Sequence, residues 1–305
     1  MNKPPATYRG RFAPSPTGPL HKGSLLAAVA SYLEARSHQG QWLVRMEDVD
    51  ELRNVKGAAD DILRSLEAYG FEWDETVLYQ TQRKQAYAEA LQQLKQQQLL
   101  YPCNCSRKSL QRKAARGEIR SGEMGYIYPG QCRGQDFDDF EAADYAVRVK
   151  VPAESIAFND ALQGHYAQHL EADSGDFVIR RRDGLFAYQL AVVVDDAFQN
   201  ISHVVRGADL LNSTPRQIFL QQRLHYTTPT YTHLPLIRGA DGSKLSKQTG
   251  ARSIGQRADI PLLVECLQRL GQKPPAALKQ ASLHTVWQWA MQNWRLTTAY
   301  PPGEP

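Results

Sequence analysis

Two short stretches of this 305-residue chain contain residues whose types and spacing suggest chemistry. In the first, RFAPSPTGPLHKGS (residues 11–24), prolines and glycines flank one histidine just before an apolar segment. A turn of this composition that leads into a helix presents backbone N–H groups and the positive end of the helix dipole, which together bind phosphate. His21, Gly23 and Ser24 lie at that point. The alternative is a tight strand-to-helix connection with an incidental histidine.

The second stretch contains Cys103, Cys105 and Cys132, whereas Cys266 stands apart. Disulfides are rare in a reducing compartment, and three thiolates can hold zinc when a fourth donor completes a tetrahedron. Histidine is the usual fourth donor, yet the segment 101–164 contains none. The spacing alone therefore leaves two interpretations open, which are a zinc site and a loop with free thiols that is ordered by packing.

The elements that must position these residues alternate between helices and strands. The predicted helices have apolar residues three and four positions apart and cover residues 25–39, 58–69, 82–99 and stretches between 260 and 295. Residues 41–50 begin as a short apolar strand and end in acidic residues. The segments DFVIRR, FAYQLAVVVDD and ISHVVRG, between 176 and 207, are rich in Val and Ile and are predicted to be strands of a buried sheet.

This order predicts an α/β fold that is divided by an insertion. Residues 1–100 and 176–250 would be the two halves of a nucleotide-binding domain, and residues 251–305 a small helical region. Residues 101–175, which hold the cysteines, would be the insertion. The net charge of +4 allows an anionic partner without requiring one. Because no apolar run approaches the ~18 residues that span a bilayer, and no signal peptide is visible, we expect a cytoplasmic protein without membrane contact.

A resemblance to a known family refines these predictions. The stretch RFAPSPTGPLHKGS resembles the signature of class I aminoacyl-tRNA synthetases, and within that class the glutamyl branch, whose H-I-G-H motif holds ATP at such a helix start. The pentapeptide KLSKQ (residues 244–248) resembles the K-M-S-K-S loop of the same class, where lysine offsets charge on the transferring phosphoryl group. The resemblance implies catalytic roles for His21, Ser24 and Lys247. It implies that ATP, with Mg²⁺, is bound by His21, Gly23, Ser24, Lys244 and Lys247.

A site for glutamate requires particular side chains, because the carboxylates of glutamate need guanidinium partners and its ammonium group needs a carboxylate. The matching positions lie in RFAPS, in RMEDVD and in the second half of the chain. The resemblance implies that the residues that bind glutamate are Arg11, Phe12, Ala13, Pro14, Ser15, Glu47, Tyr188 and Arg206.

The same family resemblance bears on the cysteines. A glutamyl-like subgroup has a C-x-C…Y-x-x-x-C site with a tyrosine ligand, and Tyr128 precedes Cys132 by the same spacing. The resemblance thus implies one structural zinc ion held by Cys103, Cys105, Tyr128 and Cys132. The basic segment SRKSLQRKAARGEIR between these cysteines is either a solvated face or a surface that contacts RNA phosphates.

A glutamyl-tRNA synthetase carries a further anticodon-binding part after its K-M-S-K-S loop, whereas 57 residues follow Gln248 here, which is too few for another domain of typical size. The resemblance therefore implies a shortened paralogue with a Rossmann-like class I catalytic domain, split by a zinc-containing, acceptor-binding-like insertion, and a stem-contact-like helical end. Such a paralogue activates L-glutamate with ATP, without tRNA. The resemblance implies that it transfers glutamate to the queuosine base in the anticodon loop of tRNA(Asp).

Three alternatives stay open at this point. A truncated synthetase would charge the 3′ end of tRNA(Glu) with the same catalytic motifs. A nucleotidyltransferase with a similar histidine turn would explain the ATP site, but neither the glutamate-type residues nor the cysteines. A zinc-stabilised RNA-binding module with an inactive ATP fold would fit the basic insertion, although intact Lys247 and Glu47 argue against it.

Overall fold

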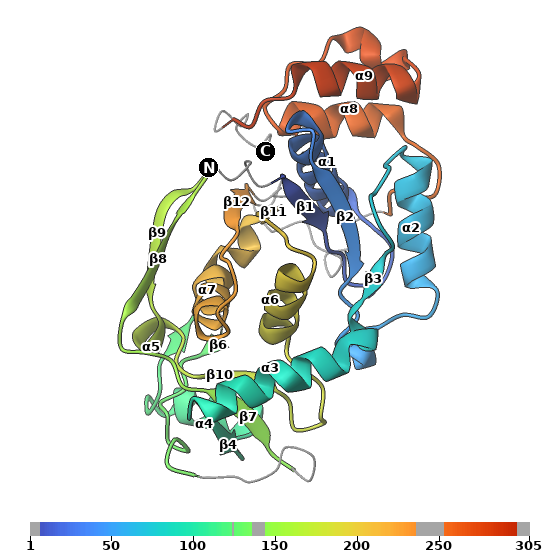
Figure 1. Ribbon diagram of the computed structural model, residues 1–305. Helices are drawn as coiled ribbons and strands as arrows, with labels where there is room; N and C mark the ends of the chain where they lie inside the picture. Colours follow the sequence, from blue (N-terminus) through green and yellow to red (C-terminus); the bar gives the residue numbers. More distant parts are fainter. Residues whose placement is uncertain (1–6, 124, 136–143, 236–252, 298–305) are drawn as a thin grey trace, which may run out of the picture.

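The computed structural model describes residues 7–123, 125–135, 144–235 and 253–297. Parallel strands form the centre of the fold in two groups, which pair in the orders β1-β2-β3 and β11-β12. The groups adjoin at β1 and β11, where the Ser202 N–H donates to the carbonyl oxygen of Arg9 at 3.0 Å (Figure 1). The strands are β1 (Arg9–Phe12), β2 (Gln41–Met46), β3 (Leu78–Tyr79), β11 (His203–Gly207) and β12 (Thr230–Leu234).

Two hydrophobic cores lie on opposite faces of these strands, because successive side chains of a strand point to opposite sides. Trp42 and Val44 of β2 enter one core, whereas Leu43 enters the other. The first core is completed by α1 (Lys22–Ser37), α2 (Ala58–Ala68), α8 (Ile260–Arg269) and α9 (Leu283–Asn293). The second core is completed by α3 (Lys84–Gln96), α6 (Tyr188–Phe198) and α7 (Thr214–Arg223). Short 3₁₀ helices occur at Glu51–Arg53, Gln80–Arg83, Ala208–Ser213 and Ala276–Gln280.

The cysteine-containing part of the chain adds an antiparallel sheet of order β10-β7-β4 at the lower end of the molecule in Figure 1. Its strands are β4 (Leu100–Cys103), β7 (Ala146–Val149) and β10 (Phe177–Arg180). A long hairpin, β8 (Ser155–Asp160) and β9 (Gly164–His169), runs from this sheet toward β12 (Figure 1). The remaining elements here are α4 (Arg107–Ala115), β5 (Ser121–Gly122), β6 (Gly125–Tyr126) and α5 (Leu170–Asp173).

The prediction of a strand for FAYQLAVVVDD is wrong, because this segment forms helix α6. A short apolar run does not distinguish a buried strand from a buried helix by its periodicity. Residues 190–196 of α6 are all buried, and α3 and α7 pack against the helix, so no polar stripe marks its helical period. The strand predictions for DFVIRR and ISHVVRG are confirmed as β10 and β11.

The predicted helices at 25–39, 58–69 and 82–99 are confirmed as α1, α2 and α3, and α8 and α9 lie in the predicted stretch 260–295. The predicted strand within 41–50 is β2. The KLSKQ segment, residues 244–248, lies outside the described residues. The four-part division of the chain at residues 100, 175 and 250 stays a prediction.

Candidate active site and metal centre

The proline- and glycine-rich turn connects β1 to the start of α1. Gly18 has a φ of 135°, a backbone conformation that favours glycine because it lacks a Cβ. His21 is the N-cap residue of α1, and its Nδ1 accepts a hydrogen bond from the Ser24 N–H at 3.3 Å. Because Nδ1 is an acceptor, a neutral His21 carries its proton on Nε2. Gly23 and Ser24 follow in the first helical turn and are partly exposed.

The chain returns to this turn after the KLSKQ segment. The Ile254 N–H donates to the carbonyl oxygen of Leu20 at 3.0 Å, and Ser253 forms a β-bridge with His21. Ile254 is thus fixed beside the helix start, six residues after the segment ends. The predicted ATP-binding residues Lys244 and Lys247 themselves lie outside the described part of the chain.

Buried charged side chains meet between β1, β2 and α6. Arg11 donates its Nε–H to Asp196 Oδ1 at 3.1 Å, and Arg45 donates an Nη2–H to the same oxygen at 2.7 Å. Arg45 also donates an Nη1–H to the side-chain oxygen of Gln199 at 2.9 Å. Burial by itself would raise the pKa of Asp196, but the charges of Arg11 and Arg45 lower it overall. Asp196 is therefore ionised between two guanidinium groups.

Glu47 extends this cluster from the end of β2. Its Oε1 lies 3.4 Å from Arg45 Nη2, and its backbone N–H donates to the carbonyl oxygen of Pro14 at 2.9 Å. The latter bond ties the turn after β1 to the end of β2. Burial raises the pKa of the Glu47 carboxyl, and the charges of Arg45 and Arg11 oppose this change only in part. A cationic group beside Glu47 would compensate for this burial.

Arg206, on β11, is held by uncharged acceptors. Its Nε–H donates to His233 Nε2 at 3.1 Å, and Nη2 donates to Thr214 Oγ1 and to Gln217 Oε1, both at 2.8 Å. The residue is 6% exposed, and its Nη1 has no hydrogen-bond partner among the described residues. Burying a guanidinium nitrogen without a partner is unfavourable, so this nitrogen is suited to an anionic ligand.

Tyr188, the first residue of α6, joins the groups described above. Burial and the charge of Glu47 raise the pKa of its hydroxyl to about 12, although the charges of Arg206 and Arg11 oppose this change. The charges of all three side chains therefore act on this hydroxyl. Four predicted glutamate-binding residues, Arg11, Glu47, Tyr188 and Arg206, thus lie in one cluster that β1, β2, α6 and β11 position.

Other residues of the predicted set are placed differently. The ring of Phe12 packs in the first core, with its centroid 6.3 Å from that of Trp42, so its side chain does not join this cluster. Ala13 is partly exposed, Ser15 is exposed, and Pro14 contributes its carbonyl oxygen to Glu47.

Sequence reasoning did not assign Arg45, Asp196, Asp160 or His233. Arg45 and Asp196 stand inside the quoted strings RMEDVD and FAYQLAVVVDD, so their proximity to Glu47 and Tyr188 was a usable signal. Asp160 and His233 form a buried pair although 73 positions separate them in the sequence, and no sequence pattern indicates this pairing.

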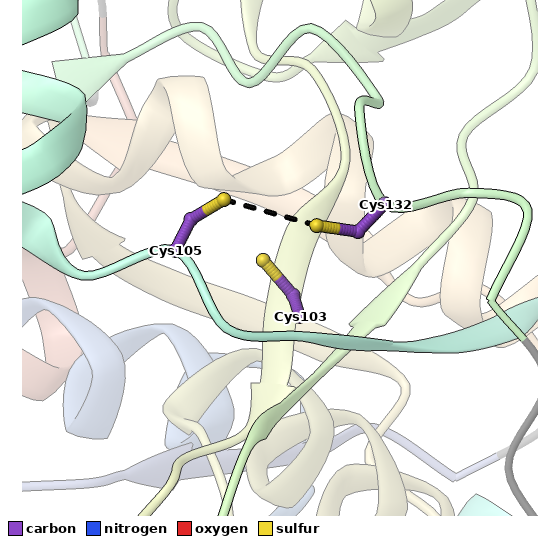
Figure 2. Close-up of side chains that lie close together, drawn as sticks. All are labelled: Cys103, Cys105 and Cys132. Atoms are coloured by element: carbon purple, nitrogen blue, oxygen red, sulfur yellow. Dashed lines mark hydrogen bonds between the residues drawn. The ribbon is translucent and has the colours of Figure 1, made fainter.

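Three of the four predicted metal ligands converge through their sulfur atoms (Figure 2). The sulfurs of Cys103, Cys105 and Cys132 all lie within 4.8 Å of one another, and those of Cys105 and Cys132 are 3.8 Å apart. With Zn–S bonds of about 2.3 Å, a tetrahedral site places its sulfurs about 3.8 Å apart. The cluster is therefore compatible with a zinc site.

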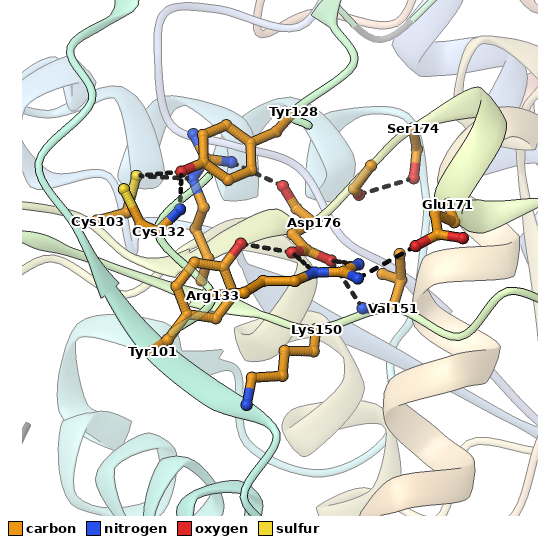
Figure 3. Close-up of polar contacts among 12 residues, drawn as sticks. Tyr101, Cys103, Tyr128, Cys132, Arg133, Lys150, Val151, Glu171, Ser174 and Asp176 are labelled. Atoms are coloured by element: carbon orange, nitrogen blue, oxygen red, sulfur yellow. Dashed lines mark hydrogen bonds and ion pairs between the residues drawn. The ribbon is translucent and has the colours of Figure 1, made fainter. Parts of the chain in front are cut away.

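The hydroxyl of Tyr128 lies beside these thiols (Figure 3). Its oxygen is 3.4 Å from Cys103 Sγ and 3.7 Å from Cys105 Sγ, and it accepts the Cys132 N–H at 3.2 Å. For a tetrahedral zinc with Zn–O of about 2.0 Å and Zn–S of about 2.3 Å, the edge between oxygen and sulfur is about 3.5 Å. The donor positions thus fit a fourth ligand at Tyr128.

A second layer of side chains supports this centre (Figure 3). Arg148 donates its Nε–H to Cys103 Sγ at 3.2 Å and an Nη1–H to the Asp176 carbonyl oxygen at 2.7 Å. Its guanidinium carbon lies 3.8 Å from the centre of the Tyr128 ring. Asp176 in turn accepts two hydrogen bonds from Arg133, at 2.7 and 2.8 Å. A positive charge therefore adjoins the thiols, as anionic sulfur ligands require.

Comparisons with known proteins identify the family to which this fold belongs. Residues 7–286 match the family of tRNA synthetases class I (E and Q), catalytic domain. A glutamate-tRNA synthetase from Elizabethkingia anophelis has a similar structure, with a TM-score of 0.77 and 25% identity over 97% of this chain and 67% of that chain. A glutamate tRNA ligase from Elizabethkingia meningosepticum, solved in complex with its amino acid, has the same TM-score of 0.77. It is 26% identical, over 97% of this chain and 66% of that chain. The fold and site thus define the catalytic domain of a class I tRNA synthetase, an enzyme of the ligase class.

Relatives with higher identity specify the family. The glutamyl-Q tRNA(Asp) synthetase of Dechloromonas aromatica (strain RCB) is 58% identical over 96% of this chain and 95% of the relative. The protein of that name from Thiobacillus denitrificans is 54% identical, again over 96% of this chain and 95% of the relative. The chain belongs to the glutamyl-Q tRNA(Asp) synthetase family. Across the described residues, no helix is both long and apolar enough to span a membrane.

Proposed function

We propose that this chain activates L-glutamate with ATP, forming glutamyl-adenylate without tRNA, and then transfers glutamate to the queuosine base in the anticodon loop of tRNA(Asp). The names of its relatives support the acceptor. The observation that carries the choice of amino acid is the buried Arg206 guanidinium, which has uncharged partners and an Nη1 without one.

The charges around Arg206 match glutamate. Three guanidinium groups, those of Arg11, Arg45 and Arg206, face two carboxylates, those of Asp196 and Glu47, so one positive charge is left uncompensated. Glutamate, with two carboxylates and one ammonium group, carries one net negative charge. In this proposal one glutamate carboxylate accepts from Arg206, and Glu47, whose pKa burial raises, receives the ammonium group. Tyr188, on which the charges of both residues act, offers a neutral hydroxyl, because burial raises its pKa to about 12. Arg11 and Ser15, with the backbone of residues 12–14, would complete the wall of the pocket.

ATP would lie at the start of α1, where His21, Gly23 and Ser24 stand at the positive end of the helix dipole. With Nδ1 accepting from Ser24, His21 can donate its Nε2–H to a phosphate oxygen. Lys244 and Lys247, in the KLSKQ segment that precedes Ile254 in the sequence, would add positive charge. Magnesium, when bound with ATP, would offset phosphate charge.

In the first step, a carboxylate oxygen of glutamate attacks the α-phosphorus of ATP, and pyrophosphate leaves with the electron pair of the broken P–O bond. The Nε2–H donor of His21 and the positive charge of Lys247 would stabilise the charge that develops on the phosphates. In the second step, a hydroxyl of the queuosine ring attacks the acyl carbon, and AMP leaves. The described residues contain no group that we assign as base for this step, and positioning alone supplies much of such a rate enhancement.

We propose that Cys103, Cys105, Cys132 and Tyr128 bind one structural zinc ion. The observed spacings between donor atoms support this set, because they match the edges of a tetrahedron. Arg148 would offset the negative charge of the four ligands. Helix α4, whose Arg107, Lys108 and Arg112 are exposed, would then be held in place to contact RNA phosphates.

Two assays test the proposal. Pyrophosphate exchange into ATP should depend on glutamate and should proceed without RNA. Absence of exchange by folded, zinc-loaded protein would contradict the activation step and favour an RNA-binding module without activity. Labelled glutamate should then transfer to tRNA(Asp) that contains queuosine and not to the same tRNA without that base. Transfer to a 3′ adenosine would instead identify a truncated glutamyl-tRNA synthetase.

A further inference from the structure

The hydrogen bonds of Arg206 continue into the β8–β9 hairpin through two fully or almost fully buried residues. Asp160, the last residue of β8, is 4% exposed, and His233 of β12 is 0% exposed. Asp160 Oδ2 lies 2.6 Å from His233 Nδ1, and His233 Nε2 lies 3.1 Å from Arg206 Nε. A chain of hydrogen bonds thereby connects β8, β12 and β11, and it ends at the proposed glutamate pocket.

The chemistry of the two end groups determines which nitrogen of His233 carries the proton. An arginine side chain has only donors, so Nε2 of His233 must accept from it. An ionised carboxylate has only acceptors, so Nδ1 of His233 must donate to Asp160. Asp160 is ionised because, although burial raises its pKa, hydrogen bonds from His233 and from the N–H groups of Gln163 and Leu162 lower it overall. His233 is therefore neutral and protonated on Nδ1.

We propose that Asp160 and His233 are positioning residues that orient Arg206 toward the carboxylate of the amino-acid substrate. The inference rests on the proposed function only for the identity of that substrate. By accepting the Nε–H through a neutral ring, His233 fixes the guanidinium without neutralising it. Arg11 and Arg45, in contrast, both contact the carboxylate of Asp196 directly. Arg206 thus keeps its charge for the ligand.

The other groups around His233 do not disturb this arrangement. Thr214 Oγ1 accepts from Arg206 Nη2, and its hydroxyl can donate to His233 Nε2, which lies 3.1 Å away. Tyr231 stacks on the imidazole with ring centroids 6.0 Å apart, and Phe158 lies on β8 at 6.3 Å. Arg206 and the more distant Arg11 are the cations that oppose protonation of the ring, and Asp160 is the carboxylate that favours it.

The substitution Asp160→Asn tests the hydrogen-bond chain from Asp160 through His233 to Arg206, because asparagine has nearly the same shape as aspartate. Oδ1 of Asp160 accepts the N–H groups of Leu162, Gln163 and His233 at 3.0, 2.9 and 3.2 Å, and an asparagine oxygen can retain all three. The amide nitrogen would then face His233 Nδ1 as a donor, and the ring proton would move to Nε2. Two donors would face each other at the contact between His233 and Arg206.

We expect Asp160→Asn to raise the KM for glutamate at least about tenfold in pyrophosphate exchange, with the KM for ATP within about twofold of the unchanged protein and kcat changed less than the KM for glutamate. Asp74→Asn is the matched control, because Asp74 likewise accepts a backbone N–H and an arginine, from Trp42 and Arg36, away from this cluster. A folded Asp160→Asn variant with an unchanged KM for glutamate would overturn the proposal.

A second measurement needs no activity. Nitrogen NMR of ¹⁵N-histidine-labelled protein should show His233, identified by loss of its signals in His233→Gln, protonated on Nδ1 in the unchanged chain. Protonation on Nε2 would overturn the inference even if Asp160→Asn does not fold. Absence of glutamate-dependent exchange in the unchanged protein would contradict the proposed function instead, while the NMR result would still decide the arrangement of this hydrogen-bond chain.

Discussion

Arg45 of β2 and Asp196 of α6 form an ion pair of 2.7 Å, although 151 positions separate them in the sequence. Arg45 is 0% exposed and Asp196 is 5% exposed. The pair joins a strand from the first part of the chain to a helix from the later part, and it supports the arginine and glutamate side chains of the proposed glutamate pocket. Its contribution is therefore both structural and positional.

Replacement of Arg45 by methionine should lower the free energy of unfolding by about 3–5 kcal/mol, because Asp196 and Glu47 would lose a buried cation. Urea denaturation measures this change. Arg64→Met is the control, since Arg64 forms an ion pair of the same 2.7 Å length with Asp61 on an exposed surface. That variant should change stability by less than about 1 kcal/mol. Equal effects of the two replacements would contradict this argument.

Sequence reasoning located the residues whose positions are set by local structure. His21 stands at the start of α1 because a glycine- and proline-rich turn precedes an apolar helical pattern. The three cysteines converge with Tyr128 beside them, an arrangement that their spacing left open and that the family resemblance implied. Such features follow from short stretches of chain, in which turn residues and periodicity act directly.

The remaining features depend on tertiary contacts that no local pattern encodes. Helix α6 is covered on several sides and therefore lacks the polar stripe that reveals a helix. The hydrogen bond between Asp160 and His233 connects a hairpin of the middle region to β12, 73 positions away. Register and packing bring such residues together, and a single sequence carries no signal for either.

Removal of one proposed zinc ligand should reduce metal binding in a graded way. Tyr128→Phe keeps the ring under Arg148 but deletes the oxygen, so we expect zinc to remain bound by three thiolates and to be lost to a chelator more readily. Cys132→Ser should bind much less zinc. Metal analysis after dialysis against a chelator measures both, and Cys266→Ser, a buried thiol far from this centre in sequence, is the control. Unchanged zinc retention in Cys132→Ser would refute the ligand set.

Stability should fall as the pH decreases below about 6.5, the ordinary pKa of histidine. Burial lowers the pKa of His233 in the folded state, with Arg206 acting in the same direction and Asp160 opposing. The unfolded chain therefore binds this proton first, and folding loses up to about 1.4 kcal/mol per pH unit until folded His233 is protonated. Burial and His38 lower the pKa of His203, which adds to this trend.

Urea denaturation between pH 7.5 and 5.5 measures this dependence. His233→Gln should show a shallower loss of stability than the unchanged protein, whatever its stability at pH 7.5, because one buried titrating group is gone. Parallel curves for the two proteins would contradict the assignment of this pH dependence to His233.

Arg216 of α7 should give the opposite result from Arg45. It is 8% exposed and, among the described residues, makes no hydrogen bond or ion pair; the Phe177 ring, 5.5 Å from its guanidinium carbon, is its nearest cation–π contact. Burial lowers its pKa to about 10. Arg216→Met should therefore raise the free energy of unfolding by about 1–3 kcal/mol, since it removes a buried charge and keeps the apolar stem.

Arg148→Met is the matched comparison, because Arg148 is also 8% exposed but donates to Cys103 and Asp176, and it should destabilise the protein. If Arg216→Met instead lowered the urea midpoint as Arg148→Met does, burial without a partner would not be the dominant property of Arg216.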